Sequence, residues 1–198
     1  MNVAEERDLW TYEEFCDVVG DGQKADLIDG VIYVASPENI RANALFVWII
    51  SLLSSFVEQR NAGRVFGSRV ALRLDRKNAP EPDVFFIKKA RQHVIKRAHI
   101  AGPADLAMEI VSPESVERDY KKKRRQYQRF GITEYWIIDE RKQRVLLLRL
   151  DRNGKYVRIP PKKGILHSEV LPGFWLRPEW LWQDPLPSVM SALAELLK

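Results

Sequence analysis

The sequence predicts an α/β fold of the α+β type, built from several short strands and a few helices. Short apolar runs bounded by turn residues recur along the chain, and such runs are typical of buried strands. Two longer segments, 40–59 and 115–130, have helical patterns with capping residues at their ends. At 198 residues and 45% hydrophobic content, residues 1–198 are expected to form one domain with a substantial core.

The first part of the chain predicts a helix, a hairpin and a second, longer helix. Thr11 and Glu14 have the spacing of a capping box, so a short helix should begin at Thr11. Residues 25–35 predict a hairpin whose turn is Asp29-Gly30. The following helix, from about Asn39 to Gln59, is apolar almost all round. It should therefore lie inside the domain or in a subunit interface.

The rest of the chain predicts the remaining strands in order. Arg64 to Leu74 alternates like one strand, and a basic loop or short helix is expected over 88–99. The helix that begins near Ser112 should end at Gly131, a favourable capping residue. A short amphipathic helix is expected over 188–197. The other predicted strands are 84–87, 106–111, the hairpin pair 134–139 and 145–150, and an edge strand at 156–159.

Composition argues for an intracellular protein. The longest apolar run, 44–57, is shorter than the roughly 18–20 residues that span a bilayer, so no membrane association is expected. The N-terminus carries acids where a signal peptide has bases. The single Cys16 excludes an internal disulfide and fits a reducing compartment, so we expect a cytoplasmic location.

Charge is distributed unevenly along the chain, although the net charge is only +5. Segment 117–129 holds seven bases against two acids, and such a surface attracts polyanions, nucleic acid first among them. The alternative is an ordinary solvated helix face, which charge alone slightly favours. The first 29 residues are acidic, with Glu5, Glu6, Asp8, Glu13, Glu14, Asp17, Asp21, Asp26 and Asp29.

Two acids, Asp83 and Glu109, stand inside apolar, strand-like runs, where a carboxylate without a partner is costly to bury. If their strands are neighbours, the acids converge on one side of the sheet, and one must protonate or a cation must lie between them. Oxygen ligands of this kind suit Mg²⁺ or Mn²⁺. Taken singly, each acid also has a structural interpretation: Asp83 as a turn or capping residue after Pro82, and Glu109 as the partner of an arginine.

Lys123 is the third candidate. Val116, Tyr120, Tyr127 and Phe130 define the inward face of the basic helix, and position 123 lies on that face. Lys123 should therefore point inward, whereas Lys121 and Lys122 point more to solvent. Asp119, one turn earlier, has the spacing of an ion-pair partner for Lys123. The alternative is that Lys123 extends its ammonium to the surface along the apolar face.

These residues together resemble the Uma-two family, described as bacterial endonucleases of the PD-(D/E)XK, restriction-endonuclease-like superfamily. The resemblance covers most of the chain. It implies a mixed sheet flanked by helices, a divalent metal, and phosphodiester hydrolysis in DNA. Asp83 and Glu109 match the metal acids, and the carbonyl after Glu109 usually completes the coordination. The matching positions are Pro82-Asp83, Glu109 to Pro113, Asp119, Lys123, Tyr127, Gly131, Glu134 to Asp139, Asp26 to Gly30, Ser36-Pro37 and Leu171 to Gly173.

Three positions depart from the family pattern. The superfamily lysine lies two residues after the second acid, where this chain has Val111; the resemblance places that lysine at Lys123, in agreement with the helical spacing. Asp26 stands where members commonly have glutamate and is a candidate supporting ligand. Members often carry a histidine soon after the Ser-Pro pair, and residues 38–43 contain none.

Three functional hypotheses follow. The first is a Mg²⁺- or Mn²⁺-dependent DNA endonuclease in which Asp83 and Glu109 hold the metal, Lys123 assists catalysis, and Asp26 and Asp119 support. The second is a non-catalytic nucleic-acid-binding protein with the same fold. The third is a protein–protein module that forms a homodimer through helix 44–57, and it is compatible with the first. Backbone phosphates would contact Lys88, Lys89, Lys121, Lys122, Arg124 and Arg125.

The other polar and aromatic candidates carry less weight. His93, His99 and His167 show no metal-ligand spacing. Ser112 is interpreted as a helix cap. Trp175, Trp180 and Trp182 are expected in the core or in a dimer contact rather than as platforms for stacked bases.

Overall fold

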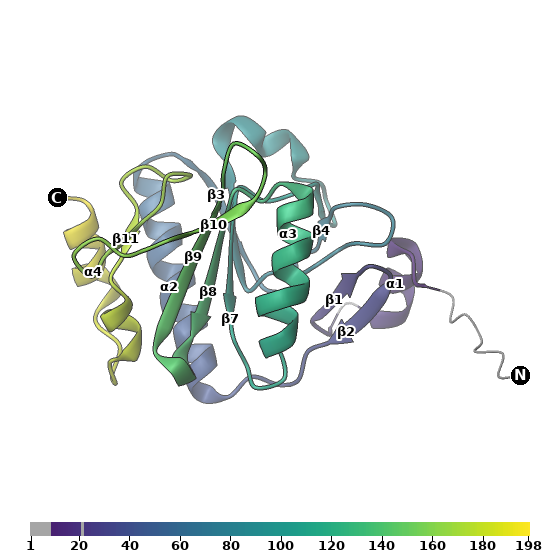
Figure 1. The fold of residues 1–198 in the computed structure, drawn as a ribbon, viewed down its shortest axis with the longest axis horizontal. Coiled ribbons are helices and arrows are strands. Elements are labelled where there is room, and N and C mark those ends of the chain that lie inside the picture. The colour runs from purple at the N-terminus through teal and green to yellow at the C-terminus, as the bar shows by residue number, and fades with distance from the viewer. Residues whose placement is uncertain (1–8, 21) are drawn as a thin grey trace, which may run out of the picture.

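The computed structural model describes residues 9–20 and 22–198. A six-stranded sheet in the order β10-β9-β8-β7-β5-β3 lies at its centre (Figure 1). Strands β7 and β8 run parallel and the other neighbouring pairs are antiparallel, so the sheet is mixed. Its strands are β3 (Gly63–Gly67), β5 (Val84–Lys88), β7 (Leu106–Ile110), β8 (Glu134–Asp139), β9 (Arg144–Leu150) and β10 (Tyr156–Ile159).

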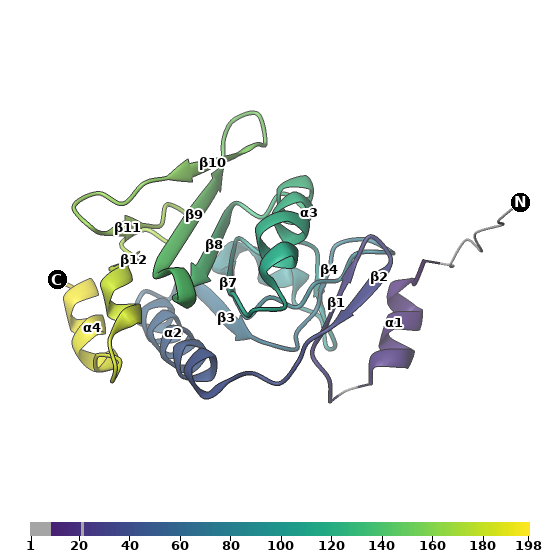
Figure 2. The same ribbon diagram turned by 60° about the horizontal axis from the view of Figure 1, so that its bottom comes forward.

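Helices cover both faces of this sheet (Figure 1 and Figure 2). Helix α2 (Ile40–Gln59) packs on one face, together with α4 (Val189–Leu196). The other face is covered by a π-helical segment, η2 (Arg118–Lys123), that continues directly into α3 (Arg124–Phe130). The predicted α/β fold with a mixed sheet flanked by helices is confirmed.

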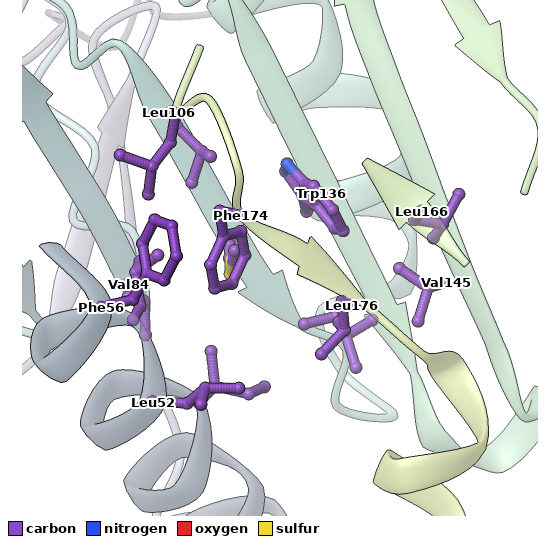
Figure 3. Packing of buried hydrophobic residues seen from close by; sticks show 14 of the residues in the cluster. Leu52, Phe56, Val84, Leu106, Trp136, Val145, Leu166, Phe174 and Leu176 are labelled. Carbon is purple, nitrogen blue, oxygen red and sulfur yellow. The ribbon is translucent and has the colours of Figure 1, made fainter. Parts of the chain in front are cut away.

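The two faces form two apolar clusters, because successive strand residues point to opposite sides of a sheet. Val84 and Phe86 of β5 join the α2 cluster, whereas Phe85 and Ile87 join the cluster under α3. Figure 3 shows Leu52 and Phe56 of α2 and Trp136 of β8 in the first cluster. Trp180 is buried there and Trp175 and Trp182 pack against it, as expected of core residues.

Helix α2 begins after its capping residue Asn39, as predicted. By length and composition alone, this helix is long and apolar enough to cross a membrane. The expectation of no membrane association, which rests on the shorter run 44–57, therefore does not follow from the length of the whole helix. In the structure its inner side, with Leu45, Leu52 and Phe56, packs in the core. Ile40 and Val47 lie on its exposed side.

A hairpin lies beside α3 (Figure 1). It consists of β1 (Ala25–Ile28) and β2 (Val31–Val34), as predicted, and follows the capped helix α1 (Tyr12–Val19). Asp29 and Gly30 both have positive φ, which favours a two-residue hairpin turn. Leu27 and Ala79 exchange backbone hydrogen bonds, and this contact brings β1 against the segment before β5.

The prediction of one strand over 64–74 is wrong. β3 ends at Gly67, and Arg69 then takes a left-handed φ of 69° that turns the chain out of the sheet. The next residues form β4 (Leu72–Arg73), which pairs in parallel with β6 (Ile100–Ala101). The basic segment after β5 contains the 3₁₀ helix η1 (Lys89–Val94), in agreement with the prediction of a loop or short helix.

The C-terminal part packs across the α2 face through short elements. These are β11 (Leu166–His167), β12 (Trp175–Leu176), the 3₁₀ helix η4 (Pro178–Trp182) and α4, which is capped by Ser188. Another 3₁₀ turn, η3 (Glu140–Lys142), joins β8 to β9. Among the acids of the N-terminal segment, Glu5, Glu6, Asp8 and Asp21 lie outside the described residues.

Candidate active site

Two carboxylates lie opposite each other where β5 begins and β7 ends. These strands are antiparallel with Val84 opposite Met108, so the next residues outward, Asp83 and Glu109, also face each other across the strands. The Ile110 N–H donates to Asp83 Oδ2 at 2.6 Å and joins the two strand ends. The two acids therefore meet on the side of the sheet that η2 and α3 cover.

Glu109 is 2% exposed, and both of its donors use one oxygen. Lys123 Nζ donates to Oε1 at 2.9 Å and the Tyr127 hydroxyl donates to the same atom at 2.6 Å. Oε2 accepts no hydrogen bond from the described residues. Burial raises the pKa of Glu109 to about 8; Lys123 opposes this rise, and Asp83 and Asp119 add to it.

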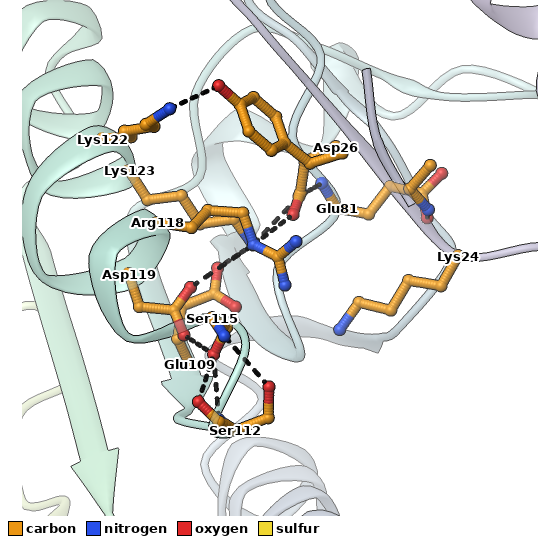
Figure 4. Close-up of polar contacts among 12 residues, drawn as sticks. Lys24, Asp26, Glu81, Glu109, Ser112, Ser115, Arg118, Asp119, Lys122 and Lys123 are labelled. Atoms are coloured by element: carbon orange, nitrogen blue, oxygen red, sulfur yellow. Dashed lines mark hydrogen bonds and ion pairs between the residues drawn. The ribbon is translucent and has the colours of Figure 1, made fainter. Parts of the chain in front are cut away.

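Lys123 points inward, as the helical spacing predicts, and is 1% exposed (Figure 4). Its Nζ lies 2.9 Å from Glu109 Oε1 and 2.9 Å from Asp26 Oδ1. The ammonium is thus enclosed between carboxylates and does not extend to the surface. Burial alone would lower the pKa of Lys123, but these acids outweigh it and raise that pKa above its ordinary value, which keeps the lysine protonated.

The predicted ion pair between Asp119 and Lys123 is wrong. Asp119 accepts a hydrogen bond from the Ser115 hydroxyl, and its Oδ1 lies 3.9 Å from Arg118 Nε. The physical reason is the π-helical segment: its turns are wider than α-helical ones, so residues four apart are not stacked as an α-helical wheel assumes.

Asp26 joins the site from the hairpin. Its Oδ1 also accepts from the backbone N–H of Glu81 at 2.8 Å, and its Oδ2 lies 3.3 Å from Arg118 Nε. Burial alone would raise the pKa of Asp26, but Lys123 and Arg118 outweigh it and hold that pKa below its ordinary value. Asp26 is therefore a carboxylate that holds the Lys123 ammonium and the Arg118 guanidinium in place.

The cluster contains more acids than bases. Burial raises the pKa of Glu81 to about 7 and that of Asp119 to about 6, as it does for Glu109. Converging carboxylates favour either a bound proton or an added cation. The members of the cluster are the acids Asp26, Glu81, Asp83, Glu109 and Asp119 and the bases Lys24, Arg118 and Lys123.

The cluster opens into a cavity of about 970 Å³. It is lined by Asp83, Glu109 and Lys123, and by Asn43 and Phe46 from the first turns of α2. The polar cluster is therefore buried by the fold and still reachable by a ligand.

Comparison with known proteins identifies the family. A family model named Uma2 and described as "Putative restriction endonuclease" matches residues 10–179. The chain belongs to the Uma2 family. A crystal structure of a "putative nuclease belonging to DUF820" from Anabaena variabilis ATCC 29413 has a TM-score of 0.72 at 19% sequence identity, and the match covers 87% of this chain and 97% of that chain. At that identity the likeness shows a shared fold. No curated protein matches this chain.

The oxygen atoms of this Uma2 protein fit a hard divalent cation. Asp83 and Glu109 present carboxyl groups across neighbouring strands, Glu109 Oε2 accepts no hydrogen bond from the described residues, and the surrounding cluster contains more acids than bases. Within residues 9–20 and 22–198, no three His, Cys, Asp or Glu side chains are grouped around one ion position. The side chains that would hold a cation are therefore the pair alone, and Lys24, which binds Asp83, would have to leave.

Val111, which stands at the position of the superfamily lysine, packs in the apolar cluster under α3. Lys123 instead approaches Glu109 from the covering helix, so an ammonium still lies beside the second acid.

Three members of the cluster were not predicted from the sequence. Lys24 precedes β1, Glu81 stands between two prolines, and Arg118 begins η2. The only local signal was at Glu81, a third acid in an otherwise apolar run. Lys24 and Arg118 resemble surface residues until β1 is placed against the segment before β5.

The six predicted phosphate-contacting residues do not form one surface around the cavity. Lys88 and Lys89 lie at the opposite end of β5 from Asp83, about 17 Å or more away at the rise of a strand. Lys121, Arg124 and Arg125 are exposed on the covering helix. Lys122 donates a hydrogen bond to the Tyr33 hydroxyl at 2.6 Å.

Proposed function

We propose that this Uma2 protein is a metal-dependent DNA endonuclease that hydrolyses phosphodiester bonds. The observation that carries the proposal is the pair Asp83 and Glu109, buried beside the protonated Lys123 and open to a cavity. Family membership and the nuclease-like fold support the same reaction class.

Asp83 and Glu109 would hold Mg²⁺ or Mn²⁺, which neutralises phosphate charge and makes a bound water more acidic. Lys123 contributes positive charge near the reacting phosphate, because an ammonium kept protonated stabilises developing negative charge and does not remove a proton from water. Asp26 positions Lys123, and Asp119 adds to the negative field around Glu109.

A second candidate function is nucleic-acid binding without catalysis. The exposed Lys121, Arg124 and Arg125 favour it, because they present charge outside the cavity and need no metal. We also propose that the protein forms a homodimer through helix segment 44–57 of α2, where Val47 is exposed; this is compatible with either function.

Cleavage of supercoiled DNA by the purified protein separates the two functions. The endonuclease converts it to nicked or linear forms in Mn²⁺ and not in EDTA, and Asp83→Ala, Glu109→Ala and Lys123→Ala each abolish this while DNA binding persists. Asp105→Asn is the control, since Asp105 is a buried acid that pairs with Arg91 outside the cluster. Binding without any cleavage of DNA or RNA by the unaltered protein would exclude the enzyme.

A further inference from the structure

Arg118 is a mostly buried arginine that pairs with carboxylates through one edge of its guanidinium. Its side chain is 15% exposed, and it lines the cavity together with Asp83, Glu109 and Lys123. None of its five N–H groups donates a hydrogen bond to a described residue, and the buried Nε has only charge contacts, with Asp26 and Asp119. Its terminal nitrogens are therefore available to an anionic ligand that enters the cavity.

The structure contains an arginine of similar burial that shows the purely structural pattern. Arg149 is 12% exposed, and all three of its nitrogens have partners. Nε donates to Glu134 Oε1 at 3.0 Å, Nη2 donates to the His167 carbonyl at 3.0 Å, and Nη1 lies 2.5 Å from Glu169 Oε1. Arg118 differs from Arg149 in partners rather than in burial.

The position of the Arg118 guanidinium is nevertheless fixed by charge. Its Nε lies 3.3 Å from Asp26 Oδ2 and 3.9 Å from Asp119 Oδ1, so two carboxylates hold the inner edge of the group. Figure 4 shows the two terminal nitrogens pointing away from Asp119. A guanidinium held by one edge presents its other edge as a planar pair of donors.

We propose that Arg118 binds the substrate phosphodiester through its two terminal nitrogens, which donate to the non-bridging phosphate oxygens. A planar pair of donors matches two phosphate oxygens, and a charge-assisted pair of this kind is both strong and directional. Arg118 is thus a substrate-binding residue that places the phosphate beside Glu109 and Lys123. This inference rests on the proposed function for its choice of ligand.

The test uses the dinucleoside phosphate TpT, which contains a single phosphodiester, in the presence of Ca²⁺. Nuclear magnetic resonance of the arginine Nε–H groups reports on Arg118 in the unaltered protein, and its signal is assigned as the one lost in Arg118→Lys. TpT should shift this signal, whereas the uncharged methylphosphonate analogue of TpT should not. Arg118→Lys should weaken TpT binding about tenfold or more, as expected for loss of a charged hydrogen-bonding pair.

Arg149→Lys is the matched control: it should lower the unfolding temperature and leave the affinity for TpT unchanged. The inference is overturned if saturating TpT leaves the Arg118 signal unmoved, if TpT does not bind, if the neutral analogue shifts the signal equally, or if Arg149→Lys loses as much affinity. TpT binding at Arg118 without DNA cleavage would support this inference and reject the endonuclease. DNA cleavage by Arg118→Lys with an unchanged KM would support the endonuclease and reject this inference.

Discussion

Replacing Glu109 by glutamine removes one ionisable group from the buried cluster and preserves its shape. The glutamine oxygen can still accept from Lys123 and Tyr127, as Glu109 Oε1 does. The difference between the two proteins is therefore the proton equilibrium of Glu109, whose pKa burial raises from 4.5 to about 8.

The sign of the effect on stability follows from proton binding. Between pH 4.5 and about 8, folded protein retains a proton on Glu109 that the unfolded chain has released, so the free energy of unfolding falls as pH rises through this window. One pKa unit corresponds to about 1.4 kcal/mol, so the full loss approaches about 5 kcal/mol. This is a large part of the roughly 5–15 kcal/mol that stabilises a domain.

Urea unfolding of the wild type and of Glu109→Gln, at about pH 5, 7 and 8.5 in EDTA, measures how the free energy of unfolding changes with pH. The stability of the variant minus that of the wild type should increase with pH, by up to about 5 kcal/mol across the window. Mg²⁺ should recover stability for the wild type at the highest pH and have little effect on the variant. A difference that is constant with pH would refute the assignment of a buried, protonated Glu109.

Three further predictions concern the surroundings of the site. Tyr127→Phe removes the 2.6 Å hydrogen bond to Glu109 and should lower the free energy of unfolding by about 1–2 kcal/mol in urea titrations; an unchanged value would contradict that contact. Gly63→Ala should lower the free energy of unfolding by more than about 3 kcal/mol, because its Cβ would lie 2.1 Å from the Ile87 carbonyl oxygen. Gly131→Ala, whose Cβ would meet no described atom, should lower it by about 1 kcal/mol. Similar unfolding temperatures for the two variants would argue against tight packing at Gly63. Combined substitution of Lys88 and Lys89 by alanine should leave DNA affinity nearly unchanged. Combined substitution of Lys121, Arg124 and Arg125 by alanine should weaken DNA binding and reduce its salt dependence. Equal effects of the two sets in binding titrations would indicate that Lys88 and Lys89 also contact DNA.

The inward direction of Lys123 was predictable because apolar residues of the same helix mark its buried face. Tyr120 and Tyr127 define that face, and Lys123 is the polar exception between them. The meeting of Asp83 with Glu109 was foreseen only as a possibility that depended on strand order. The strands prove to be antiparallel neighbours, so the two acids are opposite each other.

The rest of the cluster depends on contacts that no local pattern reveals. Arg118 lines the cavity from the π-helical η2, and the spacing of the apolar residues in that helix does not predict this. Lys24 reaches Asp83 across 59 positions of sequence. The strand predicted over 64–74 was wrong because the left-handed turn falls on Arg69, a residue that rarely takes that conformation. Formation of one domain and a cytoplasmic location stay predictions.

A crystal structure of the protein with Mn²⁺, recorded at the manganese absorption edge, tests the central claim most directly. The claim predicts one anomalous peak in contact with the carboxylates of Asp83 and Glu109, with Lys24 displaced from Asp83 and Lys123 still beside Glu109. Absence of a peak at saturating Mn²⁺, or a peak elsewhere with Lys24 still bound to Asp83, would contradict a metal centre at this pair.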